Sequence, residues 1–197
     1  MIITKNFSCK KWIKLLILFN LILLNDAKSE VFLNGGTFVQ YFNEVQISAS
    51  GGKKTFTLTP YFGIGGNLQF MGGHEFNPEF GFVRYTDTLK GVEKTQLFLH
   101  YNFSYQFNQI IKARYGLTTH WYQLKGTGGK QKLNNGAGST EFDLPDSTVT
   151  SYFTTLNLGL EGKVNQTYSI RFDYQMMEFR SSENMSANYL LTLNYIW

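Results

Sequence analysis

Apolar and polar side chains alternate along much of the chain. The clearest stretch is LFLHYNFSYQF, residues 97–107, in which every second residue is leucine, tyrosine or phenylalanine. Successive side chains of a β-strand point to opposite faces, so this spacing predicts a strand with one apolar and one mostly polar face. The same alternation recurs over 110–123, 148–161, 166–179 and 187–197. The second half of the chain is therefore predicted to consist of β-strands.

The first half of the chain carries a weaker form of this pattern. Three further strands are expected at 31–42, 54–65 and 76–86, which together with 95–107 and the four later ranges makes eight. Apolar residues fall on both faces of the first and third of these ranges, so the facing and register of the first three strands stay open. Pro60 cannot donate a ladder hydrogen bond, and we expect a bulge or a local irregularity there.

The connections between the expected strands alternate in length. Short turns are expected around Asn108 and Asn165, whereas residues 125–147 form a long, polar, glycine-rich connection. Only the glycine-rich stretch 63–73 fits this scheme poorly. Short turns on one side and longer loops on the other are typical of outer-membrane barrels. The sequence therefore predicts an all-β fold, an eight-stranded antiparallel transmembrane up-and-down β-barrel.

The first 29 residues have the pattern of a secretory signal peptide. Basic residues come first, the apolar run LLILFNLILL follows at 15–24, and Ala27 and Ser29 supply small residues for cleavage. The run has about half of the roughly 20 residues that a membrane-spanning helix needs. We therefore expect cleavage after Ser29, which divides the chain into a signal peptide at 1–29 and a barrel at 30–197.

Removing the signal peptide changes the charge balance. The whole chain has 18 basic and 14 acidic residues. The signal peptide holds five of the basic residues and one of the acidic ones, so 13 of each remain and the formal charge is zero. No basic patch is left, and nucleic acid is not expected as a partner. Cys9, the only cysteine, is also removed, so the rest of the chain can form neither a disulfide nor a cysteine metal site.

The polar positions predict which face of each strand is covered. A soluble barrel would bury the apolar face and show a surface rich in lysine and glutamate. The polar positions hold mainly Asn, Gln, Ser, Thr and Gly, which suit a confined interior. Aromatic residues near the ends of the apolar faces suit the two interfaces of a membrane; these are Tyr101, Trp121, Tyr168, Tyr189 and Trp197. We therefore expect the apolar faces to contact lipid, with a soluble ligand-carrying β-barrel as an alternative.

The final residues, YLLTLNYIW, place apolar or aromatic side chains at alternate positions: Tyr189, Leu191, Leu193, Tyr195 and Trp197. With this tail, the mature chain resembles the small eight-stranded outer-membrane β-barrels of the OmpA/OmpX type. In that family such a tail is a C-terminal assembly signal, read by the outer-membrane assembly machinery; Trp197 stands where the family more often has phenylalanine. The resemblance implies a bacterial outer-membrane location, with membrane lipid and the assembly machinery as partners.

Candidate catalytic residues are present at unsuitable spacing. His100 and Ser104 share one face of a strand, and His120 has the inward parity of the next strand. Residues i and i+4 of a strand are about 13 Å apart, whereas a hydroxyl nucleophile lies within about 3 Å of its base. We therefore predict no catalytic residue, no cofactor and no metal site. A lipid A-modifying outer-membrane enzyme is an alternative.

Charges of both signs fall on positions predicted to face the lumen: Lys112, Arg114, Glu161, Arg171 and Asp173. An eight-stranded barrel is just wide enough for side chains to fill it, and buried charges must be paired. A side-chain-filled lumen is therefore expected, with a narrow pore as an alternative. The loop at 125–147 is a possible site for a surface ligand. The predicted function is non-enzymatic, with an envelope-structural or surface-interaction role.

Overall fold

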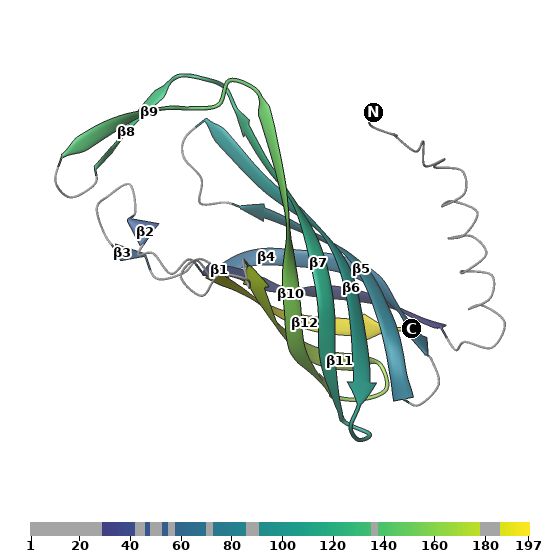
Figure 1. Cartoon of the computed structure of the whole chain (residues 1–197). Coiled ribbons are helices and arrows are strands. Elements are labelled where there is room, and N and C mark those ends of the chain that lie inside the picture. The colour runs from purple at the N-terminus through teal and green to yellow at the C-terminus, as the bar shows by residue number, and fades with distance from the viewer. Residues whose placement is uncertain are drawn as a thin grey trace, which may run out of the picture.

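Eight strands form a closed antiparallel barrel, in which each strand pairs with the next barrel strand along the chain and the first pairs with the last (Figure 1). The computed structural model describes residues 29–41, 46–47, 53–54, 58–69, 73–85, 91–134, 138–177 and 186–197. The expected signal peptide, up to residue 28, lies outside these ranges. The eight-stranded barrel predicted from the sequence is confirmed.

The barrel strands are β1 (Ser29–Tyr41), β4 (Leu58–Gln69), β5 (His74–Tyr85), β6 (Val92–Gln106), β7 (Ile111–Gly126), β10 (Thr148–Lys163), β11 (Tyr168–Met177) and β12 (Ser186–Ile196). Two short hairpins lie outside the barrel: β2 (Gln46–Ile47) with β3 (Lys53–Lys54), and β8 (Lys130–Asn134) with β9 (Ser139–Asp143). In the described ranges, no helix is long and apolar enough to span a membrane.

The second barrel strand begins and ends later than the sequence predicts. β4 covers 58–69 instead of 54–65, so the glycine-rich stretch belongs mostly to a strand. An added Cβ at Gly63 would lie 2.9 Å from Glu79 Oε1, and one at Gly65 would lie 2.5 Å from the Phe32 ring. Large lumen side chains therefore occupy the space beside these glycines. The connection after β4 shrinks to 70–73, which removes the misfit in the alternation of turns and loops.

The sequence predicts a bulge or irregularity at Pro60, but the structure has the interruption at another proline. The ladder between β1 and β4 runs at constant register through the pair Thr37 and Pro60, without an extra residue. The ladder between β4 and β5 begins one residue later, at Tyr61. The interruption lies at Pro78 of β5, where the ladder with β4 breaks. Proline has no N–H, so Pro78 cannot donate to the strand beside it.

Two of the short turns share one construction. The Asn108 Oδ1 accepts hydrogen bonds from the backbone N–H groups of Ile110 and Ile111, both at 2.8 Å. Asn165 repeats this with the two residues at 167 and 168, at the same distances. Asparagine favours turns because its side chain can satisfy nearby backbone groups in this way. We call the end of the barrel with the connections 70–73, 107–110 and 164–167 the turn end, and the opposite end the loop end. The start of β1 and the end of β12 both lie at the turn end.

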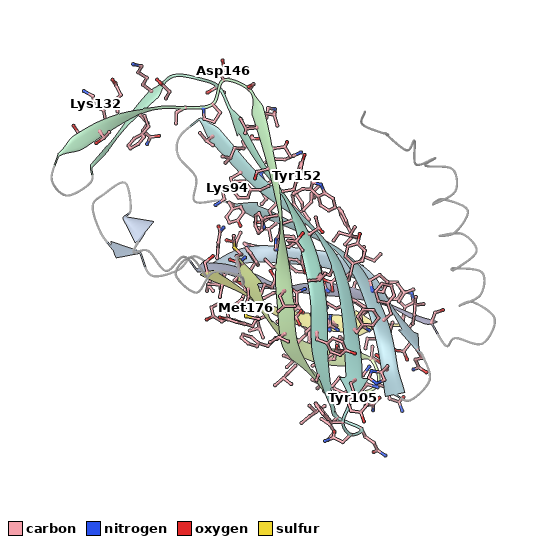
Figure 2. All side chains as sticks on the ribbon, viewed as in Figure 1. Lys94, Tyr105, Lys132, Asp146, Tyr152 and Met176 are labelled. Atoms are coloured by element: carbon pink, nitrogen blue, oxygen red, sulfur yellow. The ribbon has the colours of Figure 1, made fainter. Side chains whose placement is uncertain are left out.

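The predicted alternation of faces is confirmed in the later barrel strands, except over Thr148–Tyr152 of β10, which are all exposed. In β6, for example, His100, Asn102 and Ser104 are buried while Tyr101 and Phe103 are exposed. Figure 2 shows the side chains of the barrel on the ribbon, with Tyr105 of β6 near the turn end. The unresolved facing of the first strands is also settled, since Leu33 is exposed and Asn34 is buried. The strands therefore turn mainly polar side chains toward the interior and mainly apolar side chains toward the exterior.

The exterior is apolar around the whole barrel. Exposed aliphatic and aromatic side chains come from every barrel strand, including Leu33, Phe62, Phe80, Phe103, Leu117, Leu158, Phe172 and Leu193. Aromatic side chains cluster near the turn end, where the rings of Tyr105 and Phe107 lie 5.4 Å apart and those of Tyr195 and Trp197 lie 5.8 Å apart. At the loop end, the rings of Tyr174 and Tyr189 lie 5.3 Å apart. A continuous apolar surface of this extent is not left in water by a soluble monomer.

The barrel closes where β1 meets β12. The two strands pair from Phe32 with Ile196 to Tyr41 with Ala187. Neighbouring glycines of β1 differ sharply at this seam. An added Cβ at Gly36 would lie 2.0 Å from the backbone oxygen of Leu191, whereas one at Gly35 would have no atom within 4 Å.

This difference gives a matched pair of substitutions at the seam. Gly36→Ala forces the β1 and β12 backbones apart and should destabilise the barrel by about 1–3 kcal/mol, the usual cost of overpacking. Gly35→Ala should leave stability within about 0.5 kcal/mol of the wild type, as a surface change does. Urea titration, with the folded fraction measured by heat-modifiable gel mobility, compares the two. Equal stability of both variants would contradict the close approach at Gly36.

Candidate functional site

The side chains that fill the lumen include two layers of different chemistry. The layer nearer the loop end is apolar and consists of Phe38, Tyr61, Val83, Phe98 and Leu190, each 0% exposed. The Phe98 ring packs edge-on against Phe38 at 5.1 Å and against Tyr61 at 5.5 Å. The expected filled lumen is confirmed, with an apolar plug that the expectation of a polar interior did not include.

The layer nearer the turn end is an ion-pair network. Arg171 donates to both carboxylate oxygens of Glu79, at 2.6 and 2.9 Å, and its Nε lies 3.0 Å from Asp173. Arg114 bridges Asp173 at 3.2 Å and Glu161 at 3.1 Å. All five groups are buried. A bidentate arginine–carboxylate pair is among the strongest hydrogen-bonded arrangements in proteins, and its geometry fixes both partners.

The lumen charges predicted from the sequence are paired as expected, and two of their partners were missed. Lys112 donates to Glu75 at 2.7 and 2.9 Å. Glu75 and Glu79 both lie on β5, whose mixed pattern left its facing open. The signal that could have found them is the spacing Glu75, Asn77, Glu79, which puts three polar residues on one parity between Phe76, Pro78 and Phe80.

A chain of hydrogen bonds runs from the ion pairs into the rest of the lumen, and its direction can be assigned. Glu79 is held ionised by Arg171 and can only accept, so the Tyr61 hydroxyl donates to it. The Tyr61 oxygen then accepts from the Nε2–H of His100, at 3.0 Å. In the neutral imidazole the Nδ1 of His100 then accepts from the Thr118 hydroxyl, at 2.6 Å.

The same direction continues across the barrel to the second histidine. Thr118 accepts from the Asn157 side-chain amide, and the Asn157 Oδ1 accepts from the Thr155 hydroxyl at 3.1 Å. Thr155 in turn accepts from the Nε2–H of His120, at 2.9 Å. In this arrangement both neutral imidazoles carry their proton on Nε2.

The chain ends near the loop end of the lumen. The Gln96 amide donates to the Nδ1 of His120 at 2.8 Å, and the Gln96 Oε1 accepts from the Tyr85 hydroxyl at 2.6 Å. Every donor from Tyr85 onward thus points toward Glu79. The amides of Gln96 and Asn157 interrupt any proton relay, because an amide nitrogen does not readily take up a proton. The chain holds side chains in place and does not form a proton path.

The lumen offers no accessible catalytic group among its histidines. Ser104 donates to Glu75 at 3.2 Å and makes no contact with His100, in agreement with the spacing argument. Thr118, His100 and, through Tyr61, Glu79 follow the order of a nucleophile, a base and an orienting acid, yet all of them are buried. A substrate could reach none of them. No group of His, Cys, Asp and Glu side chains suited to a metal ion occurs in the described ranges.

Lys94 lies at the loop end of the lumen, among side chains from three other strands. Its Nζ lies 3.9 Å from the centre of the Tyr85 ring and 5.0 Å from that of Tyr122, and it donates to Gln40 at 3.3 Å. Attraction of an ammonium group to the faces of two aromatic rings holds the side chain in this position. Sequence analysis did not single out Lys94, because the two rings come from different strands.

The predicted surface loop at 125–147 contains an ordered hairpin. Gly128 and Gly129 have φ values of 74° and 100°, which turn the chain from β7 into β8. Backbone bonds from Gly128 to Pro145 and from Leu144 to Gly129, both 2.8 Å, close its base. Figure 1 shows β8 and β9 projecting away from the barrel at the loop end.

The hairpin has a charged face. Lys130 pairs with Asp143, and Lys132 with Glu141, at directly opposite positions of the two strands. The Lys130 Nζ lies 3.8 Å from Glu141 and 3.9 Å from Asp143. The other face carries Phe142, which is half exposed. Among the described residues outside the barrel, this hairpin is the candidate contact surface.

No protein-family model matches the chain, and no curated protein does. Among solved structures, Ail, the attachment invasion locus protein of Yersinia pestis in complex with the heparin analogue sucrose octasulfate, is 10% identical with a TM-score of 0.50; the match covers 87% of this chain and 99% of that chain. Neisserial surface protein A is 9% identical with a TM-score of 0.50, covering 87% and 99%. Ail is an outer membrane protein. At these identities the likeness concerns the fold alone, and the fold is that of the small outer-membrane barrels.

The ion-pair layer yields a test of its contribution to stability. Arg171→Ala leaves Glu79 buried without its partner, which should cost about 3–5 kcal/mol. Arg84→Ala breaks the exposed pair with Glu93, at 3.7 Å, and should cost at most about 1 kcal/mol. The free energy of unfolding in urea measures both. The combined change Arg171→Met with Glu79→Gln should recover most of the loss; equal effects of the two alanine variants would refute the buried pairing.

Proposed function

We propose that the chain is an integral protein of a bacterial outer membrane, with an envelope-structural or surface-interaction role. The observation that carries the proposal is the apolar, aromatic-ended exterior of a closed barrel whose interior is filled. A bilayer provides the hydrocarbon that such an exterior needs, and barrel closure leaves no strand edge unpaired within it. The neighbouring folds, including that of an outer membrane protein, support the same location.

The filled lumen favours a structural or surface role over transport. A narrow pore would need a gap through both the apolar plug and the ion-pair layer. The side chains of the apolar layer are fully buried, and the charged side chains of the ion-pair layer form salt bridges with one another. Hydrolysis of lipid A would need an accessible base, and both lumen histidines are bonded within the barrel.

Surface contact is proposed for the β8–β9 hairpin. Lys130 lies between two carboxylates, so the hairpin presents charges of both signs and no isolated basic patch. This arrangement suits a polar partner such as a protein or an uncharged polysaccharide better than the sulfated ligand bound to Ail. The half-exposed Phe142 on the opposite face adds an apolar contact.

Cysteine labelling tests the location, the orientation and the signal peptide together. We expect the protein in the outer-membrane fraction with heat-modifiable mobility. A membrane-impermeant maleimide should label Lys132→Cys on intact cells and Gln166→Cys, at the turn end, only after the outer membrane is permeabilised. The denatured wild type should take no label, because Cys9 is removed with residues 1–29. Recovery in the soluble periplasm, or equal labelling of both variants on intact cells, would overturn the proposal.

We further propose that Tyr189, Leu191, Leu193, Tyr195 and Trp197 form the signal that the assembly machinery reads. Tyr189, Leu191, Leu193 and Tyr195 are on the outward face of β12, and Trp197 follows its last residue. The Trp197 side chain is exposed, and only its backbone N–H bonds to the barrel, at 3.1 Å from the Val31 oxygen. Its side chain is therefore available for recognition without being required for closure.

Recognition and stability can be separated by one pair of variants. Trp197→Ala should lower the amount in the outer membrane severalfold in cells, and should leave refolding from urea into detergent micelles unchanged. Tyr168→Ala, which removes an outward aromatic ring 5.5 Å from Tyr195, should change neither. Equal cellular levels of Trp197→Ala and wild type would refute the signal, as would a matching loss in the micelle assay.

A further inference from the structure

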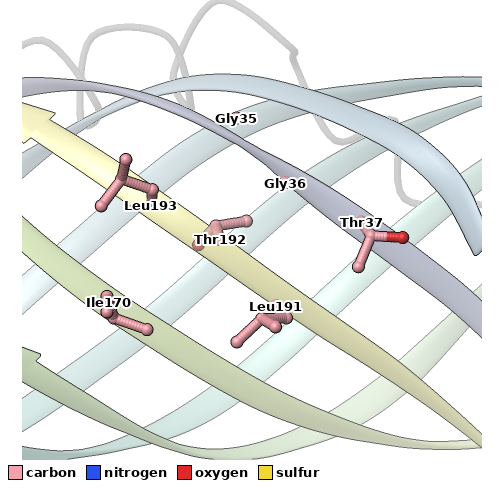
Figure 3. Close-up of a pocket in the computed structure, with 7 residues that line it drawn as sticks. All are labelled: Gly35, Gly36, Thr37, Ile170, Leu191, Thr192 and Leu193. Atoms are coloured by element: carbon pink, nitrogen blue, oxygen red, sulfur yellow. The ribbon is translucent and has the colours of Figure 1, made fainter.

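β10 extends further toward the loop end than its neighbour β11 does (Figure 1). On one side it pairs with β7 over 148–162. On the other side it pairs with β11 only over 156–163, and β11 ends at Met177. Among the described residues, no strand pairs with 148–155 on this side. β12 in Figure 3 shows the usual arrangement, since β1 and β11 pair with its two edges. We call residues 148–152 of β10 the open edge.

Three backbone hydrogen bonds show which residues of β10 point toward the open edge. Ser147 accepts a bond from the end of β7, and Lys163 donates one to the turn before β7, so the odd-numbered residues face β7. Val164 donates to the start of β11, so the even-numbered residues face the other way. The register with β7 is constant throughout, so no bulge changes this parity. The free N–H and C=O groups are therefore those of Thr148, Thr150 and Tyr152.

The open edge lies where water can reach it. Tyr152 is opposite Trp121 of β7, a pair of aromatic residues that suits the outer membrane interface. The next outward pair toward the loop end is polar, Thr150 with Gln123. All five residues of the open edge are exposed. An unpaired strand edge is not tolerated in hydrocarbon, and this one begins where the aromatic pair marks the end of the apolar exterior.

The open edge lacks the features that usually protect a strand edge from pairing. Such edges carry charged residues, proline or bulges, which block a second strand. The open edge has the sequence TVTSY, with none of these. Its β-branched and aromatic residues favour an extended conformation instead. It is therefore suited to pair with a further strand.

The backbone groups identify the class of partner. An extended polypeptide presents the same alternation of N–H and C=O groups and can form a ladder with them, whatever its side chains. A lipid acyl chain has no such groups. The open edge has no charged side chain to recognise an ionic ligand.

A second copy of the barrel fits poorly as the partner. Strands of outer-membrane barrels are tilted by about 35–45° from the membrane normal. Two barrels related by a two-fold axis along that normal would therefore cross their β10 strands at about 70–90°. A ladder needs strands that run nearly side by side, with a rotation of only about 20–25° between neighbours.

We propose that the open edge binds an extended segment of another protein outside the cell, which adds a strand to β10 beyond the end of β11. The inference rests on the proposed outer-membrane location and orientation. It deepens the proposed surface role, because it assigns a class of partner and a site separate from the β8–β9 hairpin.

Amide hydrogen exchange of the folded protein in detergent micelles, followed by NMR, tests whether the edge is open. The N–H groups of Thr148, Thr150 and Tyr152 should exchange at least about tenfold faster than those of Val149 and Ser151, which face β7. Slow exchange at all five positions would mean that the edge is already paired, and would overturn the proposal.

A synthetic peptide of about ten alternating valine and threonine residues is the probe for strand addition. It should slow exchange at the three free N–H groups, whereas the same peptide with alternate amides methylated should not. Thr150→Pro removes one of these N–H groups without removing a bond to β7, and should weaken peptide binding about tenfold. Thr150→Val keeps the N–H and should bind within about twofold of the wild type. If Thr150→Pro gives no folded band, the methylated peptide makes the same comparison on the wild type.

The outcomes separate this inference from the proposed function. Equal binding of the two peptides, or of the two Thr150 variants, refutes strand addition. A wild-type dimer that Thr150→Pro converts to monomer shows that a second copy occupies the edge, and overturns the choice of partner. These measurements are made in micelles and do not depend on location. Absence of the protein from the outer membrane instead refutes the proposed function, and with it the partner's place outside the cell.

Discussion

Pairing of β1 with β12 is the constraint on which the rest of this structure depends. Backbone N–H and C=O groups have no partners in hydrocarbon, so a sheet can lie there only if its two edge strands bond to each other. The bond from Trp197 to Val31 carries this pairing to the last residue of the chain. Closure also fixes the width of the interior, and every inward side chain must then fit a space that no strand can widen by itself.

The interior meets this condition with charge as well as with apolar bulk. Glu79 occupies the centre of the arrangement, because Arg171 reaches it from β11 and Tyr61 reaches it from β4. Burial of an ion pair costs much of what the pairing returns, so the network is a modest source of net stability. Its geometric effect is larger. Bidentate contacts across the barrel specify which inward residues face one another. Packing of leucine and phenylalanine side chains alone would specify these neighbours less strictly.

The parts of the structure that follow from local pattern could be read from the sequence, and the parts that depend on contacts across the barrel could not. The alternation in LFLHYNFSYQF was enough to place β6 and its two faces, because a strand's side-chain period is fixed at two. The limits of β4 were predicted wrongly, because a cluster of glycines such as Gly63, Gly65 and Gly66 usually indicates a turn. Here Gly63 leaves room for large neighbours such as Tyr61, and these neighbours could not be known from the sequence. Lys112 and Arg114 were correctly expected to be paired. Glu161 and Asp173, the partners of Arg114, were among the expected lumen charges, but the individual pairs were not predicted. Glu75 was not identified as the partner of Lys112, because it lies 37 residues away on a strand of mixed pattern.

The one-way hydrogen-bond chain gives the inside and the outside of the barrel different freedom to vary in evolution. Between Tyr85 and Glu79, the direction in which each hydroxyl, amide or imidazole donates is fixed by the next group in the chain. The Glu79 carboxylate, which can only accept, fixes the direction of the whole chain. Turning the Asn157 amide around would leave the His100 ring without its donor, and the reversal would spread along the whole chain. Lumen residues can therefore be exchanged only in compatible sets. Outward positions such as Leu158 or Phe172 need only remain apolar, and can drift one at a time. Homologues of this barrel should accordingly share their interior in blocks and differ freely on the surface that meets lipid.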